Sequence, residues 1–207
     1  MVPGPTVIYE CGHCSGLIEY PTIASGNTFG ARVWTDGKMD APMLPDMPLL
    51  VKCPHCRSMV WITEQKEVGK MRPWLVDRHP YPSARPYEEP TVDDYVGYLA
   101  ESDLNADKEF YARVRLWWLF NDGRRYASRR LPLTAREIEN LTALLDLMND
   151  DATSEPLGKA EILRELGRFD EALALLTSIP ESERSKAVLF LVNLARLGDP
   201  YVREYPD

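Results

Sequence analysis

The sequence predicts an α+β chain in which a small β domain precedes an all-α domain. Three observations support this fold class: all four cysteines form C-x-x-C pairs before residue 57, 12 of the 17 prolines lie in residues 1–90, and apolar residues recur every three or four positions only after Pro90. The 207 residues suffice for one medium domain or two small ones. We therefore expect a β domain at 1–70, a connector at 71–90 and a helical domain at 91–207.

The two cysteine pairs, Cys11-Gly-His-Cys14 and Cys53-Pro-His-Cys56, are predicted to hold one metal ion. A gap of two residues lets a tight turn aim both thiolates at a tetrahedral ion, and two such turns complete a structural zinc site. The residues around each pair favour short strands, which is the plan of a zinc ribbon. We therefore predict one structural Zn²⁺ bound by Cys11, Cys14, Cys53 and Cys56.

Other uses of the cysteines are weighed against zinc. Cys-Gly-His-Cys resembles the active site of protein disulfide isomerases, and Cys-Pro-His-Cys that of bacterial periplasmic thiol oxidases, but such sites need a helix after the first cysteine, which these flanks do not favour. Disulfides would need an oxidising compartment, whereas Met1–Thr6 has no secretory signature, so a cytoplasmic location is expected. His13 and His55 are expected outside the shell that four thiolates already close.

The 38 residues between the pairs exceed the spacing of compact ribbons, so an insertion is expected at 21–48. Asp36-Gly37 predicts a hairpin turn within it. One interpretation makes the insertion a recognition surface, and the other has it close the small core of the ribbon. The recognition surface would comprise Asn27, Phe29, Arg32, Trp34, Asp36 and Met43.

Residues Ser25–Met39, Ala41-Pro-Met-Leu-Pro45 and Leu50-Val-Lys-Cys-Pro-His-Cys56 together resemble an uncharacterised bacterial family. Its members pair an N-terminal four-cysteine zinc ribbon with a C-terminal tetratricopeptide-like helical region. The likeness covers about residues 6 to 65. It implies this architecture and a bacterial cytoplasmic setting, and it implies no activity.

The connector and the helical domain differ in local signals. Five prolines in 71–90 favour an extended segment, which is either a flexible linker or a strip that lies on a domain through Trp74, Tyr81 and Tyr87. Helix start signals are Thr91 with Asp94, and Thr134 with Glu137. The helices are predicted after each start signal, at about 107–120 ending at Asn121-Asp122-Gly123, and at about 156–166, 169–178 and 182–197.

Two Leu-Gly pairs, Leu166-Gly167 and Leu197-Gly198, lie 31 residues apart, near the 34-residue period of tetratricopeptide repeats. The segment Ala160–Ala172 is similar to the turn of such a repeat. The helical domain is therefore predicted to be a helical-hairpin, tetratricopeptide-like array, with a plain helix bundle as the alternative.

The charge distribution and the sequence motifs restrict the classes of function that the chain can have. Residues 91–207 carry 15 Lys and Arg against 22 Asp and Glu, yet six arginines fall within 113–130 beside two tryptophans. They either form local ion pairs or bind an anion such as nucleic acid. The anion-binding candidates are Arg124, Arg125, Arg129 and Arg130.

No nucleotide-binding, metalloprotease or nucleophile–base pattern is found, and only His79 lies outside the cysteine pairs, so an enzyme is not expected. The apolar runs are too short to span a bilayer. The predicted function is a non-catalytic zinc-binding adaptor or scaffold that mediates protein–protein interaction with an unidentified protein partner. The alternatives are a nucleic-acid-associated zinc-ribbon factor, or an immunity or antitoxin protein that binds a cognate toxin.

Overall fold

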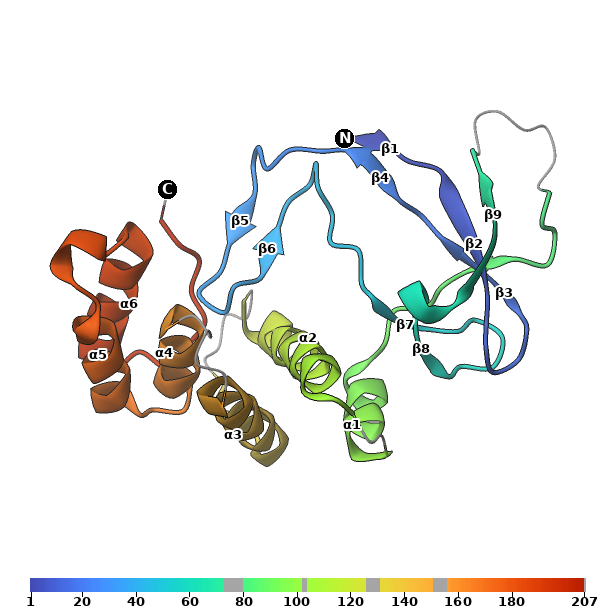
Figure 1. Ribbon diagram of the computed structural model, residues 1–207. Helices are drawn as coiled ribbons and strands as arrows, with labels where there is room; N and C mark the ends of the chain where they lie inside the picture. Colours follow the sequence, from blue (N-terminus) through green and yellow to red (C-terminus); the bar gives the residue numbers. More distant parts are fainter. Residues whose placement is uncertain (73–79, 102–103, 126–130, 151–155, 207) are drawn as a thin grey trace. The chain divides into compact units, whose positions relative to one another are not determined.

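The computed structural model describes residues 1–72, 80–101, 104–125, 131–150 and 156–206. The chain forms two compact units (Figure 1). Unit 1 comprises residues 1–31 and 40–94, and unit 2 comprises residues 32–39 and 95–207. The described residues form small sheets and six α-helices, which confirms the α+β fold class. The domain boundaries differ from the prediction, because eight residues of the expected insertion belong to the helical unit.

Unit 1 is built on a four-stranded sheet with the order β10-β3-β2-β9. Strand β2 pairs antiparallel with β3 and β9, and β10 adds in parallel to β3. Two smaller ladders, β1–β4 and β7–β8, complete the unit. The bounds are β1 Val2–Pro3, β2 Thr6–Glu10, β3 Leu17–Tyr20, β4 Ile23–Ser25, β7 Leu50–Lys52, β8 Met59–Trp61, β9 Lys66–Met71 and β10 Arg85–Pro86, with a 3₁₀ turn at Ile62–Glu64.

The strands predicted around the cysteine pairs are confirmed. Strands β2 and β3 flank the first pair, and β7 and β8 flank the second. Cys11 and Cys53 lie in the buried core of unit 1, with side chains from all four strands around them. That core is small, so the two cysteines are a substantial part of it. Its other members are Ile18, Tyr20, Val51, Val60 and Ile62.

The described part of the connector, residues 80–90, lies on the sheet of unit 1. Tyr87 N–H donates to the Glu19 carbonyl oxygen at 3.2 Å, and the Tyr20 and Tyr87 rings are 5.6 Å apart. Residues 73–79, which include Trp74 and His79, are outside the described residues.

Helix α1 (Val92–Glu101) begins at the predicted signal. Thr91 N–H donates to Asp94 Oδ2 at 2.9 Å, and Asp94 N–H donates to Thr91 Oγ1 at 3.3 Å. Lys52 donates to the same carboxylate, with Nζ 2.7 Å from Oδ1. Burial opposes ionisation of Asp94, but Lys52 and Thr91 outweigh it and lower the pKa of this carboxyl to about 2. Lys52 therefore holds the start of α1 against β7.

Substitution of Lys52 by Met is expected to lower the free energy of unfolding by about 2 kcal/mol, because it leaves the Asp94 carboxylate without its charged donor. Urea unfolding of the full chain at pH 7 measures this loss. Lys66→Met is the matched control, since Lys66 makes an exposed 3.3 Å pair with Glu10 that contributes about 0–1 kcal/mol. Equal losses in the two variants would contradict this role of Lys52.

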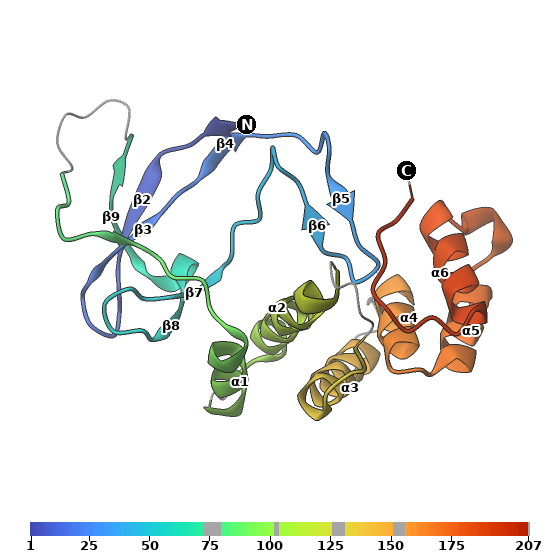
Figure 2. The ribbon, with the colours of Figure 1, turned by 180° about the vertical axis from the view of Figure 1, so that it is seen from behind.

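Unit 2 contains five further helices, α2 to α6 (Figure 2). Side chains from all five form one apolar core. The largest fully buried leucine and isoleucine side chains of unit 2 come from α3, α4, α5 and α6. Their bounds are α2 Ala106–Arg125, α3 Ala135–Asp150, α4 Pro156–Glu165, α5 Phe169–Ser178 and α6 Lys186–Arg196, with a 3₁₀ turn at Glu181–Glu183. None of the helices in the described ranges is both long and apolar enough to cross a membrane.

Helix α2 corrects one sequence expectation. The turn residues Asn121-Asp122-Gly123 were expected to end the helix, but it continues to Arg125. Asn121 Nδ2 donates to Asp36 Oδ2 and to Glu165 Oε1, both at 3.0 Å, and Arg125 Nε donates to Asp122 Oδ1 at 2.8 Å. The two tertiary bonds of Asn121 outweigh the local preference for a turn.

The two Leu-Gly pairs end α4 and α6 with the same backbone geometry. Gly167 and Gly198 have φ values of 76° and 63°. Arg168 N–H donates to the Leu163 carbonyl, and Asp199 N–H donates to the Leu194 carbonyl, at 2.8 and 3.0 Å. Both ends are therefore Schellman caps, in which glycine takes the left-handed position without strain.

The predicted hairpin is present as β5 (Arg32–Val33) and β6 (Met39–Asp40), with Gly37 in the turn at φ 80°. Residues 32–39 lie in unit 2, where the C-terminal segment pairs with them. Thr35 N–H donates to the Arg203 carbonyl and Tyr205 N–H donates to the Val33 carbonyl, both at 2.8 Å. The hairpin is therefore a component of the helical unit.

Candidate metal centre

The two cysteine pairs form turns with equivalent backbone bonds. In the first turn, Cys11 N–H donates to the Gly16 carbonyl at 3.0 Å and Ser15 N–H donates to the Cys11 carbonyl at 2.8 Å. In the second turn, Arg57 N–H donates to the Cys53 carbonyl at 2.9 Å. Ser15 and Arg57 both adopt left-handed backbone, with φ values of 58° and 64°. Each pair is thus shaped by its own short turn.

The four sulfur atoms of these turns converge on one point. All four Sγ atoms lie within 4.8 Å of one another. Cys11 Sγ is 3.9 Å from Cys56 Sγ, and Cys14 Sγ is 3.8 Å from Cys53 Sγ. A tetrahedral ion with metal–sulfur bonds of about 2.3 Å has sulfur–sulfur edges of about 3.8 Å. The donor set therefore fits a tetrahedral metal ion bound by four thiolates.

The metal-free thiols are not equivalent. Burial raises the pKa of the Cys53 thiol to about 12. Burial also acts on Cys56, but hydrogen bonding with Ser58 outweighs it and lowers the pKa of the Cys56 thiol to about 6. Because thiolates are the ligands, metal binding must release protons from the cluster, and the affinity for metal must rise with pH.

His13 and His55 lie in the two cysteine turns, beside the sulfur cluster. His13 is exposed, and His55 Nε2 is 2.9 Å from the Leu17 carbonyl oxygen. A Cβ atom on Gly16 would lie 2.5 Å from the His55 ring, so glycine is required there for close packing of the two turns. Neither histidine belongs to the four-sulfur cluster.

Gln65 is a residue of the centre that the sequence analysis missed. Gln65 Oε1 accepts from Gly12 N–H at 2.8 Å, and Gln65 Nε2 donates to the Trp61 carbonyl at 3.0 Å. The side chain thus ties the first turn to the end of β8. No local pattern marks a single glutamine after a strand, so sequence offers no signal for it.

The proposed recognition residues fall into two groups. Asn27, Phe29 and Met43 are exposed in unit 1. Trp34 and Asp36 are each 4% exposed in unit 2, so neither can present its side chain to a partner there. Arg32 is exposed and donates to Glu204, with Nε 2.9 Å from Oε1.

Arg124 and Arg125 form internal ion pairs. The Arg125 guanidinium pairs with Asp36 and the Arg124 guanidinium pairs with Glu137, and the two arginine side chains are 0% and 9% exposed. Neither cation is therefore exposed on the surface as a nucleic-acid phosphate site would require. Arg129 and Arg130 are outside the described residues.

A buried polar network surrounds Asp36 in unit 2, and it includes Glu161 and Glu165 of α4. Both are buried. Arg164 Nε donates to Glu161 Oε2 at 2.8 Å, and the Thr35 hydroxyl donates to Glu161. Helix α4 therefore turns charged side chains inward, where the hairpin supplies some of their partners.

Comparison with known proteins gives no match: no protein-family model, no curated protein and no solved structure corresponds to this chain.

Proposed function

We propose that Cys11, Cys14, Cys53 and Cys56 hold one structural Zn²⁺. The near-tetrahedral sulfur edges of 3.8 and 3.9 Å support this assignment, as does the all-thiolate donor set, which suits zinc. The ion would cross-link the two turns and neutralise thiolate charge in a small core. Four thiolates leave no open position for a substrate, which supports a non-catalytic role.

We further propose that the protein is a non-catalytic adaptor that binds another protein through unit 1. One observation carries this proposal: Phe29 is 83% exposed on a loop that is itself well anchored. Asn27 Oδ1 accepts from Phe29 N–H at 3.0 Å, and Asn27 N–H donates to the Met43 carbonyl at 3.3 Å. Exposed aromatic side chains held in place are typical anchors of protein interfaces.

Other exposed apolar side chains lie on the segments that hold this loop. Met43 is 38% exposed, and its carbonyl oxygen accepts the hydrogen bond from Asn27 N–H. The Met1 amino nitrogen is 3.8 Å from Met43 Sδ. Val2, which is 56% exposed, pairs with Ser25 just before the loop. The proposed partner surface therefore combines one aromatic side chain with flexible apolar side chains, which suits an apolar segment of a protein.

Substitution of Phe29 by Ser is expected to abolish capture of the partner, because it removes the anchor without touching a buried group. The measurement is a pull-down from the native host with the full chain as bait, quantified by mass spectrometry. A protein enriched by the unsubstituted bait should be lost with Phe29→Ser and retained with Leu189→Ser, which removes another exposed apolar side chain, in α6. The three baits should have the same melting temperature. Equal enrichment by all three, or none, would refute the proposal.

A further inference from the structure

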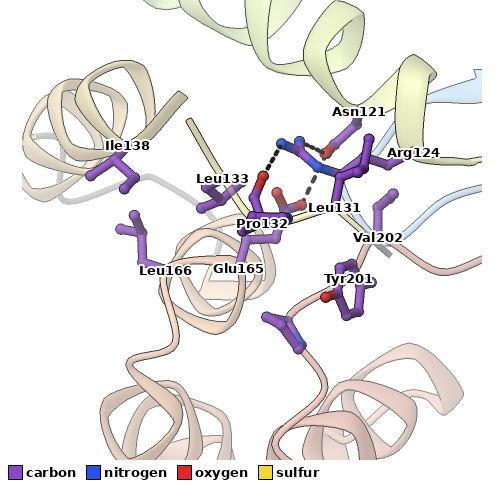
Figure 3. Close-up of a pocket in the computed structure, with 11 residues that line it drawn as sticks. Asn121, Arg124, Leu131, Pro132, Leu133, Ile138, Glu165, Leu166, Tyr201 and Val202 are labelled. Carbon is purple, nitrogen blue, oxygen red and sulfur yellow. Dashed lines mark hydrogen bonds between the residues drawn. The ribbon is translucent and has the colours of Figure 1, made fainter. Parts of the chain in front are cut away.

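A cavity of about 350 Å³ lies within unit 2, between the ends of α2 and α4, the start of α3 and the C-terminal segment (Figure 3). Natural small-molecule sites begin at about this volume. Most of its lining is apolar, and a few polar groups from α2 and α4 reach it. The apolar side chains come from Leu131, Leu133, Ile138, Leu166 and Val202.

The first polar group is Arg124, which lines the cavity from α2. Its side chain is only 9% exposed. Its terminal nitrogens reach the Pro132 carbonyl at 3.4 Å and Asn121 Oδ1 at 3.5 Å, and they pair with Glu137. Its Nε is buried with no hydrogen-bond partner among the described residues. A buried guanidinium N–H without an acceptor costs free energy, so a ligand oxygen that accepts from Nε would stabilise this position.

The second polar group is Glu165, at the end of α4. Burial and the nearby carboxylates of Glu161 and Asp36 raise the pKa of Glu165 well above its usual range, so its neutral form is favoured. Two donors contact it: Trp117 Nε1 at 3.1 Å and Asn121 Nδ2 at 3.0 Å. A neutral carboxyl group there can also donate through its hydroxyl proton.

Asn121 brings these two groups together, since its amide contacts Arg124 through Oδ1 and Glu165 through Nδ2. Figure 3 shows the three side chains at one side of the cavity. That side offers the Arg124 Nε, which has no partner in the described part of the chain, and a carboxyl group that can donate, and most of the remaining wall is apolar. We propose that this cavity binds a small monocarboxylate with a compact apolar body, its carboxylate on Arg124 and Glu165 and its body against Leu166 and Val202.

The test is an NMR titration of the full, metal-loaded chain with 3-phenylpropanoate, up to about 10 mM. Saturable shifts are expected at the amides of Leu166 and Val202. The matched amine, 3-phenylpropylamine, is expected to bind at least about ten-fold more weakly, because it cannot accept from two donors. Absence of saturation with the acid, or equal binding of the amine, would overturn the proposal.

Two variants separate the site from other surfaces. Arg124→Lys keeps a cation beside Glu137 but lacks Nε, and it should weaken binding of the acid about ten-fold. Ile138→Trp fills the rim of the cavity from a side chain that is 46% exposed, and it should abolish binding without changing thermal melting. Leu189→Trp is the control, because Leu189 is 56% exposed elsewhere on the unit. Unchanged binding in Ile138→Trp would count against this cavity.

Discussion

Removal of the metal is expected to unfold unit 1. The apolar cluster that holds Cys11 and Cys53 contains, in the described ranges, only five other buried side chains, so burial alone gives this part of the unit little stability. Binding of structural zinc supplies about 10–16 kcal/mol in small zinc domains, and that free energy is lost with the ion. The core of unit 2 contains no cysteine among its described members, so the signals of α3–α6 are expected to persist.

The measurement combines elemental analysis with two-dimensional NMR before and after chelation. One zinc ion per chain is expected at the start, and dispersed amide signals from β2, β3, β7 and β8 should collapse when the ion is removed. Cys53→Ser should reproduce the collapse, whereas Ser15→Ala, in the first turn but outside the sulfur cluster, should not. A folded unit 1 after complete metal removal would contradict this expectation.

Substitution of Asp36 by Ala is expected to cost unit 2 about 3 kcal/mol, because the buried Arg125 guanidinium loses the carboxylate on its two terminal nitrogens and keeps, among the described residues, only the ion pair of its Nε with Asp122. Arg125 Nη1 lies 3.0 Å from Asp36 Oδ1, and both side chains are 0% exposed. The same carboxylate accepts from Asn121, and the Asp36 carbonyl accepts from Trp118 Nε1 at 2.9 Å. Loss of one side chain therefore disturbs the contact of the hairpin with α2.

Denaturant unfolding followed by helix circular dichroism measures this cost. Arg32→Ala is the matched control on the same hairpin: its pair with Glu204 is 45% and 39% exposed, and it should cost about 0–1 kcal/mol. The double variant Asp36→Ala with Arg125→Met should recover part of the loss, since it removes the buried cation that has lost the Asp36 carboxylate. A cost for Asp36→Ala no larger than the control would refute the role of this carboxylate.

The parts of the fold and of the candidate site that the sequence could predict are those with a local signal. Each cysteine pair is shaped by the turn that contains it, so spacing alone located the sulfur cluster. Capping pairs such as Thr91 with Asp94 located a helix start for the same reason. Gly37 likewise marked the hairpin turn, which lies where Asp36-Gly37 predicted it.

The position of the hairpin in unit 2 had no such signal. Asp36 pairs with Arg125, which lies 89 residues further along the chain, and the sequence around either residue does not indicate the other. The same absence explains the error at Asn121, whose turn preference is outweighed by Asp36 and Glu165. Burial of Glu161 and Glu165 has no local signal either, because a helix with many charges suggests a solvated face, and only the three-dimensional partners show otherwise.

The path of the chain limits how the two units can recombine. A gene fusion made at residue 91 would carry the helices of unit 2 to a new protein but leave Trp34, Thr35 and Asp36 behind with the cysteines. Arg125 and Glu161 would then arrive without their hairpin partners. The two units are therefore expected to be inherited together, and a transferable helical module would have to carry residues 32–39 by circular permutation or by a grafted hairpin.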